Sequence, residues 1–228
     1  MSFFLNFFRK IKNRLYPNLT KREHKRWIKD GADFALRFNY PLTYNSIIFD
    51  LGGFKGDFAS DLFSRMPCKI YIFEPVRDYA VRIDKRFKLN TNILVYSFGL
   101  SHKTEEKYIT LDGSGSSLYR NTMIKNVNLP REKVKLVDVV EFIDSNKISE
   151  IDLFKINIEG GEYDVIPRLL DTKMINKIKY IQIQFHELEK NSKHKKELIR
   201  KRLMETHTCD YCYEYVWENW VRNDLIIY

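Results

Sequence analysis

The sequence contains little glycine, proline or cysteine: nine, six and three residues among 228. The shortage of glycine and proline, with no low-complexity tract or internal repeat, excludes fibrous and disordered chains and indicates a globular protein. Three cysteines, an odd number, argue against a disulfide framework and for a reducing compartment. No apolar run approaches the roughly 20 residues that a transmembrane helix requires.

Aromatic residues and positive charge are abundant. With 16 Phe and 14 Tyr, the chain is long and apolar enough for one domain with a full core. The formal net charge of +9 is unevenly spread, because residues 1–30 hold nine Lys and Arg against two Asp and Glu, a net +7. The other 198 residues contribute only +2. We therefore expect a basic helical arm over residues 1–40 and a single domain over residues 41–228.

The start of the arm has an amphipathic pattern. At helical spacing, one stripe contains Phe4, Phe7, Phe8, Ile11 and Leu15. Cations flank this stripe, so residues 1–16 suit peripheral contact with an anionic membrane, with docking on the domain or on a partner subunit as the alternative. The apolar residues precede the charges, the reverse of a secretory signal. We expect a cytoplasmic protein, with the inner face of the membrane as its contact surface; the oligomeric state stays open.

Apolar segments and helical patterns alternate through the rest of the chain. The expected strands are residues 47–50, 69–75, 92–100, 151–158 and 179–187. This β-α-β rhythm predicts an α/β fold, a mostly parallel sheet with helices on both faces. An excursion over residues 103–137 interrupts the rhythm. The aromatic, alternating C-terminal segment predicts antiparallel strands at the sheet edge.

The stretch IIFDLGGFKGDF, residues 47–58, joins a buried strand to a glycine loop. It is not a dinucleotide fingerprint, because Phe54 stands where the second glycine of G-x-G-x-x-G belongs, and it lacks the Gly-Lys-Ser/Thr of a P-loop. What remains is D-x-G-x-x-x-G, formed by Asp50, Gly52 and Gly56. A carboxylate under the loop repels a pyrophosphate but attracts an ammonium or a sulfonium, which favours S-adenosylmethionine.

Two further charged residues lie in or after apolar strands. Glu74 follows the second strand, where a carboxylate can accept hydrogen bonds from both ribose hydroxyls of an adenosine. Helix capping or simple solvation is the alternative. Lys155 lies within the strand IDLFKINI, so it needs a partner, Asp50 or Glu159, if it is buried. An exposed lysine at a strand kink is equally compatible with the pattern.

Five short motifs resemble those of one family, in the family's order. KINIEGGEYDVI, residues 155–166, is similar to the K-I-D-V-E-G-A-E-x-x-V-L signature of FkbM-type S-adenosylmethionine-dependent methyltransferases. The glycine loop, IFEP, S-G-S-S-L at 114–118 and V-x-L-V-D at 134–138 resemble its other motifs. The resemblance implies a Rossmann-like class I methyltransferase, with a mostly parallel seven-stranded sheet and an antiparallel edge strand. It also implies S-adenosylmethionine as cofactor and a hydroxyl of a sugar, glycan or natural product as acceptor.

Motif positions and strand ends together give the expected cofactor site. Its residues are Asp50, Gly52, Gly53, Phe54, Gly56, Glu74, Pro75, Gly99, Leu100 and Asn157. The chain departs from the family where Asn157 replaces the signature aspartate and Gly53-Phe54 replaces Ala-Asn. Asn157 lacks a charge, so no metal is expected, and a cofactor-binding protein without catalysis is an alternative. Cys209 and Cys212 lack the further ligands of a zinc site.

The catalytic base is expected after the fourth or fifth main strand, beside the cofactor's methyl group. His186 titrates near neutrality and is the first choice as base, with Glu159 orienting it or binding the acceptor hydroxyl. A histidine packed at a strand end is the alternative. The pI near 9.3 leaves a nucleic-acid methyltransferase as a third reading. No nucleic-acid partner is expected, because the domain is nearly neutral and lacks nucleic-acid-binding motifs.

Overall fold

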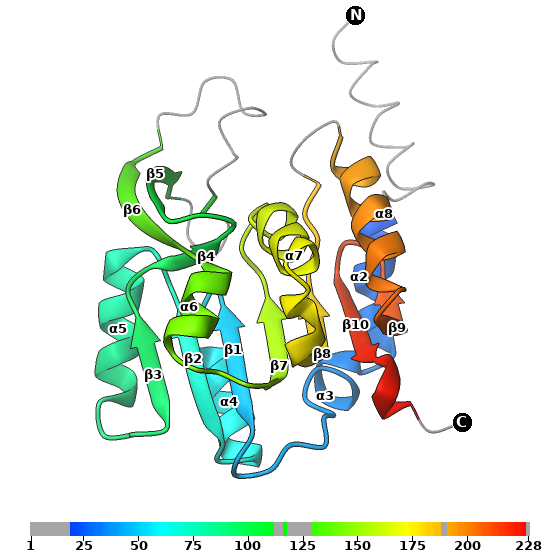
Figure 1. Cartoon of the computed structure of the whole chain (residues 1–228), viewed down its shortest axis with the longest axis horizontal. Coiled ribbons are helices and arrows are strands. Elements are labelled where there is room, and N and C mark those ends of the chain that lie inside the picture. The colour runs from blue at the N-terminus through cyan, green and yellow to red at the C-terminus, as the bar shows by residue number, and fades with distance from the viewer. Residues whose placement is uncertain (1–18, 112–115, 118–128, 188–190, 227–228) are drawn as a thin grey trace, which may run out of the picture.

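A computed structural model describes residues 19–111, 116–117, 129–187 and 191–226 (Figure 1). Its main sheet has seven strands in the order β3-β2-β1-β7-β8-β10-β9. These strands are β1 Ile47–Leu51, β2 Lys69–Phe73, β3 Ile93–Tyr96, β7 Ile151–Ile156, β8 Ile178–Ile183, β9 His207–Tyr213 and β10 Trp217–Arg222. The helices are α2 Leu19–Lys29, α3 Ala32–Ala35, α4 Asp57–Arg65, α5 Arg77–Phe87, α6 Val139–Ser145, α7 Glu162–Asp171 and α8 Ser192–Leu203, with short 3-10 turns at Met174–Lys177 and Asn223–Leu225.

The order of the strands confirms the predicted fold class. β1 pairs in parallel with β2 on one side and β7 on the other, so the chain order reverses between β1 and β7. In open α/β sheets, ligands bind at such a switch point, beyond the carboxyl ends of the strands. β10 runs antiparallel to both β8 and β9. The antiparallel strand therefore lies one position inside the edge, and β9 forms the edge itself.

The third predicted strand, residues 92–100, is two strands in two sheets. β3 ends at Tyr96, and β4 Gly99–Ser101 pairs instead with β6 Arg131–Asp138. β6 also pairs antiparallel with β5 Glu105–Thr110, which makes a three-stranded sheet above the main one. Gly99 lies opposite Leu136 in this pairing, and a Cβ on it would approach the leucine side chain at 2.9 Å. The sequence does not reveal this break, because β3 and β4 are both apolar and at least half-buried, so residues 92–100 form one continuous apolar pattern.

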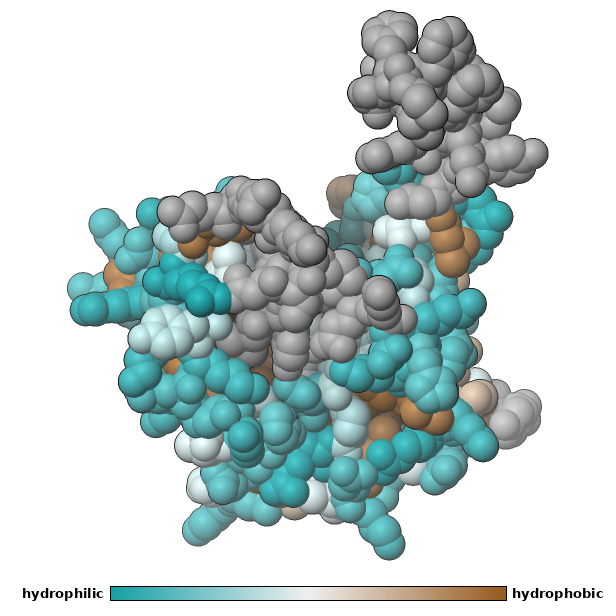
Figure 2. All heavy atoms as spheres, turned by 90° about the horizontal axis from the view of Figure 1, so that it is seen from above, coloured by the Kyte–Doolittle hydropathy of each residue, from teal (hydrophilic) through white to brown (hydrophobic). Residues whose placement is uncertain are grey.

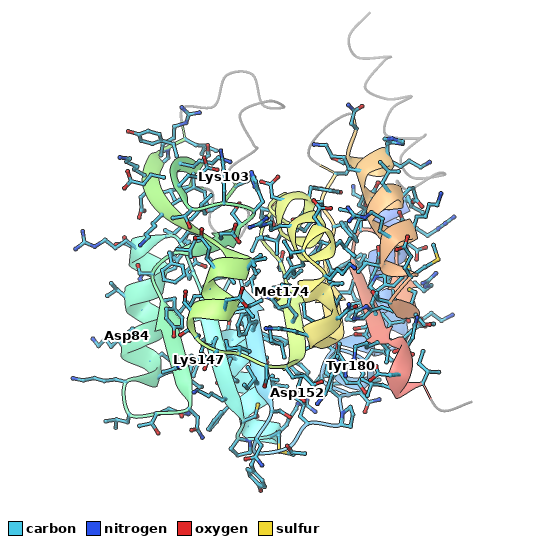
Figure 3. The ribbon with its side chains drawn as sticks, in the orientation of Figure 1. Asp84, Lys103, Lys147, Asp152, Met174 and Tyr180 are labelled. Carbon is cyan, nitrogen blue, oxygen red and sulfur yellow. The ribbon has the colours of Figure 1, made fainter. Side chains whose placement is uncertain are left out.

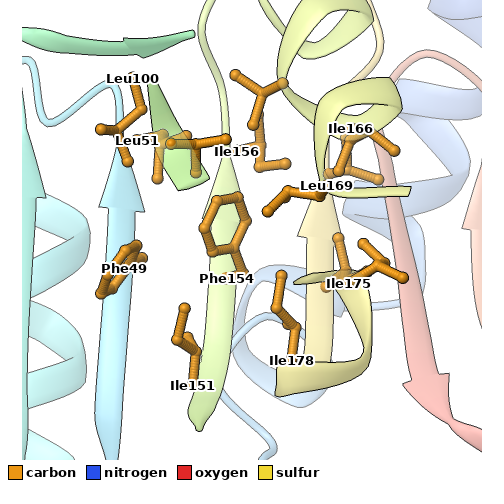
Figure 4. Packing of buried hydrophobic residues seen from close by; sticks show 14 of the residues in the cluster. Phe49, Leu51, Leu100, Ile151, Phe154, Ile156, Ile166, Leu169, Ile175 and Ile178 are labelled. Atoms are coloured by element: carbon orange, nitrogen blue, oxygen red, sulfur yellow. The ribbon is translucent and has the colours of Figure 1, made fainter. Parts of the chain in front are cut away.

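Two apolar layers hold helices against the sheet. On one face, α6, α7 and α8 cover a cluster that includes Phe49, Phe154 and Ile181, all fully buried. Figure 4 shows part of this cluster, with Phe49 and Phe154 labelled. On the other face, α4 and α5 pack through Leu62 and Ile83 against side chains of β1 and β2. Both faces of the parallel strands are therefore apolar, as their continuous hydrophobic runs predicted.

The second half of the basic arm packs on the C-terminal hairpin. Trp27 of α2 is only 2% exposed, and its ring lies edge-on to Tyr213 at a centroid distance of 5.1 Å. Arg26 stacks over Tyr213 and donates to the carbonyl oxygen of Cys212 at 2.6 Å. The division of the chain at residue 40 stays a prediction, and the amphipathic stripe lies outside the described residues. Among the described helices, none has the length and apolarity needed to cross a bilayer.

Polar side chains at the two ends of the sheet differ in kind. At the lower end, Asp152 of β7 accepts hydrogen bonds from the Ile47 amide at 2.8 Å and from Lys179 Nζ at 2.9 Å. Figure 3 shows Asp152 and Tyr180 at this end and Lys103 near the small sheet at the opposite end. The lower contacts tie neighbouring strands together, whereas the upper end carries the loops that follow the parallel strands.

Candidate active site

The glycine loop lies at the upper end of β1 in a conformation that needs glycine. Gly52 has a φ of 82°, and a Cβ there would overlap the carbonyl oxygen of Asn157. Gly56, with a φ of 76°, precedes the first residue of α4. Phe54 also adopts a left-handed φ, 49°, which is a strained conformation for a large side chain. The loops after β1 and β7 therefore touch through their backbones.

Glu74 holds this loop in place. Its Oε2 accepts a hydrogen bond from the Phe54 amide at 2.8 Å, and its Oε1 accepts one from the Val76 amide at 2.9 Å. Burial raises the pKa of Glu74, against the opposite effect of these two backbone amides. A carboxylate has about four lone-pair sites, so two remain for the hydroxyls of a ligand. Glu74 is thus both a loop anchor and a lining residue of the cleft.

Lys155 is buried and paired with Asp50, which excludes both the exposed lysine and Glu159 as its partner. Its Nζ lies 2.7 Å from Asp50 Oδ1 and also donates to the carbonyl oxygens of Leu51 at 3.3 Å and Gly52 at 3.0 Å. The other oxygen of Asp50 has no hydrogen-bond partner among the described residues. The lysine therefore fixes the end of β1 from below, and breaking such a buried pair is strongly destabilising.

A cleft opens above these residues, with about 830 Å³ of empty space that includes its open mouth. Seven of the ten expected cofactor residues line it: Gly52, Phe54, Glu74, Pro75, Gly99, Leu100 and Asn157. Asp50, Gly53 and Gly56 do not: Asp50 lies in β1 and is paired with Lys155, and the two glycines shape the backbone of the loop. A Cβ on Gly53 would overlap the side chain of Ile72.

The opposite wall of the cleft consists of residues that were not named individually in the expected site. Tyr79 of α5 meets Phe54 edge-on at 5.0 Å between ring centroids. Ile109 of β5 and Leu136 of β6 bring in the small sheet. Leu136 and Ser116 had a sequence signal, as parts of the V-x-L-V-D and S-G-S-S-L motifs. Ser116 also lines the cleft; the rest of S-G-S-S-L, apart from Ser117, lies outside the described residues.

Asn157 lines the cleft, and its side chain has an unused acceptor. Its Oδ1 is buried and has no hydrogen-bond partner among the described residues. Leaving a buried amide oxygen unpaired costs about 1–3 kcal/mol, so such an atom marks a place where a donor is expected. The change from aspartate to asparagine keeps this acceptor and removes its charge.

His186 lies between two glutamates at the rim of the cleft. Its Nε2 is 3.2 Å from Glu159 Oε1, and its Nδ1 is 3.1 Å from Glu162 Oε1. Glu162 is fully buried and also accepts from the backbone amides of His186 and Gly160, each at 2.8 Å. The structure thus brings together the two residues that were predicted to be catalytic. It adds Glu162, the second glutamate of the E-G-G-E segment, whose role the sequence analysis did not address.

The position of Glu159 depends on a strained backbone. Its φ of 48° is left-handed, and Gly160 follows with a φ of 106°. The hydroxyl of Ser117 donates to the Glu159 carbonyl oxygen at 2.6 Å and holds this turn from the side of the small sheet. Glu159 lines the cofactor cleft, whereas His186 does not. The carboxylate, rather than the imidazole, is the group presented to the cleft.

The charge state of His186 conflicts with its predicted role as the base. Burial alone would lower its pKa, but the charges of Glu162 and Glu159 and their hydrogen bonds outweigh burial and raise it to about 10. At neutral pH the ring is therefore an imidazolium that donates from both nitrogens and has no lone pair left to accept a proton. His186 instead donates to Glu159 and orients it, whereas the sequence predicted that Glu159 orients His186.

One cluster of potential metal ligands occurs among the described residues, away from the cleft. It consists of Cys212, Glu214 and Glu218, with ligand atoms within 4.8 Å of one another. Arg200 donates to Glu214 at 2.8 Å and to Glu218 at 2.5 Å, so a guanidinium already balances these carboxylates. Cys209 is not part of the group. The cluster is an ion-pair network that joins α8 to β9 and β10.

Comparisons with known proteins gave one family match and several similar structures. The family model described as the methyltransferase FkbM domain matches residues 50–213, and no curated protein sequence matches significantly. A putative rRNA-methylase from Clostridium thermocellum is similar in structure, with a TM-score of 0.50 and 10% identity over 86% of this chain and 94% of that one. An rRNA methylase from Streptococcus thermophilus gives 0.46 and 12% over 86% and 95%. M. capricolum TrmK in complex with S-adenosyl-homocysteine gives 0.44 and 13% over 80% and 65%.

The likeness to the Clostridium thermocellum structure bears on the fold alone, because the sequence identity is only 10%. The family match is stronger evidence, since it spans well over half of the chain and includes the glycine loop, Glu74 and the segment after β7. It confirms the predicted family, the methyltransferase activity and the S-adenosylmethionine cofactor. The chain belongs to the FkbM family of S-adenosylmethionine-dependent methyltransferases.

Proposed function

We propose that the protein methylates a hydroxyl group of a sugar, a glycan or a related small molecule. The observation that carries this proposal is the carboxylate of Glu159, which lines the cofactor cleft and is held there by His186 at 3.2 Å. An alcohol is a poor nucleophile, and a positioned base contributes about 10²–10⁴-fold to such reactions. Glu159 is the group in this cleft best placed to serve as that base.

The residues of the cleft fit S-adenosylmethionine. Glu74 has two lone-pair sites left for ribose hydroxyls, and Tyr79, Ile109 and Leu136 supply an apolar wall for a base ring. The unpaired Oδ1 of Asn157 offers an acceptor to the ammonium group. When bound, the cofactor supplies an electrophilic methyl group on a sulfonium sulfur. None of these residues needs to change partners to accept it.

The residues around Glu159 explain how it can accept a proton. Bound S-adenosylmethionine would supply the methyl group to the acceptor oxygen, and the Glu159 carboxylate would accept the proton that the hydroxyl loses. His186 stays protonated, donates to Glu159 and fixes its orientation, while Glu162 fixes His186. His186 therefore orients the Glu159 carboxylate, and the fully buried carboxylate of Glu162 holds His186 in place.

The test is Glu159→Gln, which keeps the shape of the side chain and removes its charge. Labelled S-adenosylmethionine is incubated with sugar nucleotides, lipid-linked glycans and purified RNA, and S-adenosylhomocysteine binding is measured in parallel by calorimetry. We expect turnover on a glycan or sugar acceptor, and an about 10²-fold or greater loss in Glu159→Gln with cofactor affinity unchanged. Turnover on RNA alone, or tight cofactor binding without turnover on any acceptor class, would contradict the proposal.

We also propose that residues 1–16 bring the protein into peripheral contact with an anionic membrane. The support is the sequence alone: an apolar stripe flanked by cations, within a segment of net charge +7. A reducing, cytoplasmic setting agrees with three cysteines that form no disulfide.

A further inference from the structure

Two consecutive residues at the start of α7 hold the main chain of His186. The backbone N–H of His186 donates to Glu162 Oε1 at 2.8 Å, and its carbonyl oxygen accepts from the Tyr163 hydroxyl at 2.9 Å. Glu162 also accepts from the ring atom Nδ1 at 3.1 Å. The remaining polar atom of His186, Nε2, lies 3.2 Å from Glu159 Oε1. The start of α7 therefore fixes both the position of His186 and the direction of its ring.

Tyr163 is the residue of this pair that had no sequence signal. In the signature K-I-D-V-E-G-A-E-x-x-V-L, Glu162 matches the second glutamate, and Tyr163 matches a position without a fixed residue. The half-buried ring of Tyr163 packs on Phe185, with 5.7 Å between the ring centroids. The bond from its hydroxyl to His186 therefore depends on a residue that the signature does not specify.

The Tyr163 hydroxyl has a second partner on α8. It forms a hydrogen bond with Ser192, the buried first residue of that helix. His186 and Ser192 stand on either side of residues 188–190, which lie outside the described part of the chain. One hydroxyl therefore fixes the segment after β8 relative to α7 and α8 together.

The contacts around His186 are shielded from water. Seen from above, the described part of this end of the molecule is mostly hydrophilic (Figure 2). Beneath this surface the side chain of Glu162 is fully buried, and that of His186 is only 12% exposed. Burial raises the pKa of Tyr163, so its hydroxyl stays protonated and able to donate. Hydrogen bonds in such surroundings are stronger than the same bonds in water.

We propose that Tyr163 is a positioning residue for methyl transfer, which fixes His186 so that its ring holds the Glu159 carboxylate at the cofactor cleft. The inference rests on the proposed function, in which Glu159 is the base. Tyr163 does not line the cleft, so it acts through His186. A misplacement of about 1 Å in a reacting group can cost about 10²-fold in rate, so we expect loss of this hydrogen bond to slow the reaction.

Tyr163→Phe isolates the hydroxyl, because the remaining ring can still pack on Phe185. The matched control is Tyr213→Phe. The Tyr213 hydroxyl also makes a hydrogen bond, to Asp30 Oδ2 at 2.8 Å, but this bond joins β9 to the residue after α2, and Tyr213 does not line the cleft. Each variant loses one bonded hydroxyl, so an effect of lower stability alone would appear in both.

The first experiment follows the ring nitrogens of His186 by NMR in the full-length protein labelled with ¹⁵N-histidine, between about pH 6 and pH 11. His186→Gln identifies its signals among those of the five histidines. The charged groups that face the ring are Glu159 and Glu162, and they give the parent a His186 pKa of about 10. In Tyr163→Phe we expect a pKa lower by at least about 0.5, a roughly threefold weaker hold on the protonated ring, with the control like the parent. An equal His186 pKa in all three proteins would overturn the inference.

The second experiment measures kcat and the KM for S-adenosylmethionine in the same proteins, with the acceptor that the parent methylates. We expect kcat to fall at least about fivefold in Tyr163→Phe with KM unchanged, and both values to match the parent in Tyr213→Phe. An unchanged kcat, or a change confined to KM, would overturn the positioning role.

The two experiments separate this inference from the proposed function. Turnover on RNA alone contradicts the proposed acceptor class but not the positioning role. If the parent methylates no acceptor, the proposed function fails, and the titration of the His186 ring still decides whether Tyr163 fixes it. Full activity of Glu159→Gln overturns both, because Tyr163 then has no base to position.

Discussion

At the scale of single residues, the cleft uses two buried carboxylates in different ways. Asp50 is neutralised by Lys155 at 2.7 Å and lies behind the glycine loop. Glu74 has only backbone amides as hydrogen-bond partners among the described residues, and burial raises its pKa. The first carboxylate therefore stabilises the fold beneath the cleft. The second keeps lone pairs for a ligand while it shapes the loop.

Replacing Glu74 with alanine is expected to weaken S-adenosylhomocysteine binding by at least about tenfold, because it removes two backbone hydrogen bonds and the ribose acceptor together. Glu74→Gln should lose less, since its amide oxygen can still accept from one backbone N–H. Lys201→Ala on the exposed part of α8 is the control and should bind the cofactor like the parent. Calorimetric titration measures all three, and a Glu74→Ala affinity equal to that of the control would remove Glu74 from the cofactor site.

The pKa of His186 predicts how stability depends on pH. The pKa is about 10 in the folded protein and about 6.5 in an unfolded chain, so the folded state binds the extra proton between these values. The stabilisation is complete below about pH 6.5 and is lost as the pH rises toward 10. Urea unfolding of the parent and of His186→Gln at pH 6.5 and pH 10 should give a stability difference that shrinks at the higher pH. A constant difference would mean that the ring is not held protonated.

Sequence reasoning named Glu159 and seven of the expected cofactor residues that line the cleft, but not the electrostatics of the site. The pairing of Lys155 with Asp50 was one of two options, and parallel register between β1 and β7 decides it, since the two residues are direct neighbours. The sequence could not predict that His186 is protonated. It depends on the left-handed turn at Glu159, which brings a second carboxylate to a ring that already contacts Glu162.

At the scale of elements, periodicity predicted the main sheet and failed where one apolar segment serves two sheets. Residues 92–100 read as one strand because both halves are apolar, yet β4 leaves the main sheet to pair with β6. The partner strand lies more than thirty residues further along the chain. Such long-range pairing leaves no local sequence signal. The small sheet that results supplies the wall of the cleft that the sequence analysis lacked.

The attachment of α2 to the hairpin gives a second element-level expectation. Trp27→Ala should destabilise the protein by about 3–5 kcal/mol, because it empties a buried site against Tyr213. Ile28→Ala on the same helix is the matched control, since Ile28 is 62% exposed and should change stability by less than about 0.5 kcal/mol. Denaturant unfolding followed by fluorescence and by far-UV circular dichroism measures both. If the two variants are equally stable, α2 is not an integral part of the domain.

At the scale of the whole molecule, charge is arranged around the active-site end. The net +7 of residues 1–30 includes α2, which carries Lys21, Lys25 and Lys29. α8 adds a second basic helix near the same sheet edge, with Arg200, Lys201 and Arg202 in its last turn. The positive charge is therefore concentrated on one side of a nearly neutral domain. Such a field attracts anionic acceptors or an anionic surface and weakens as salt is added.

Deleting residues 1–16 tests binding to an anionic membrane separately from binding of an anionic acceptor. We expect the truncated protein to lose most of its binding to vesicles that contain anionic lipid, because it loses an apolar stripe and four cations, each contributing about 1 kcal/mol near such a surface. Methyl transfer to a soluble acceptor should stay close to that of the parent, since the described residues that line the cofactor cleft are all retained. Vesicle sedimentation at low and high salt, with neutral vesicles as the control, measures the first expectation. Undiminished binding by the truncated protein would transfer the membrane contact to α2 and α8, and loss of its solubility would indicate that the segment packs on the protein instead.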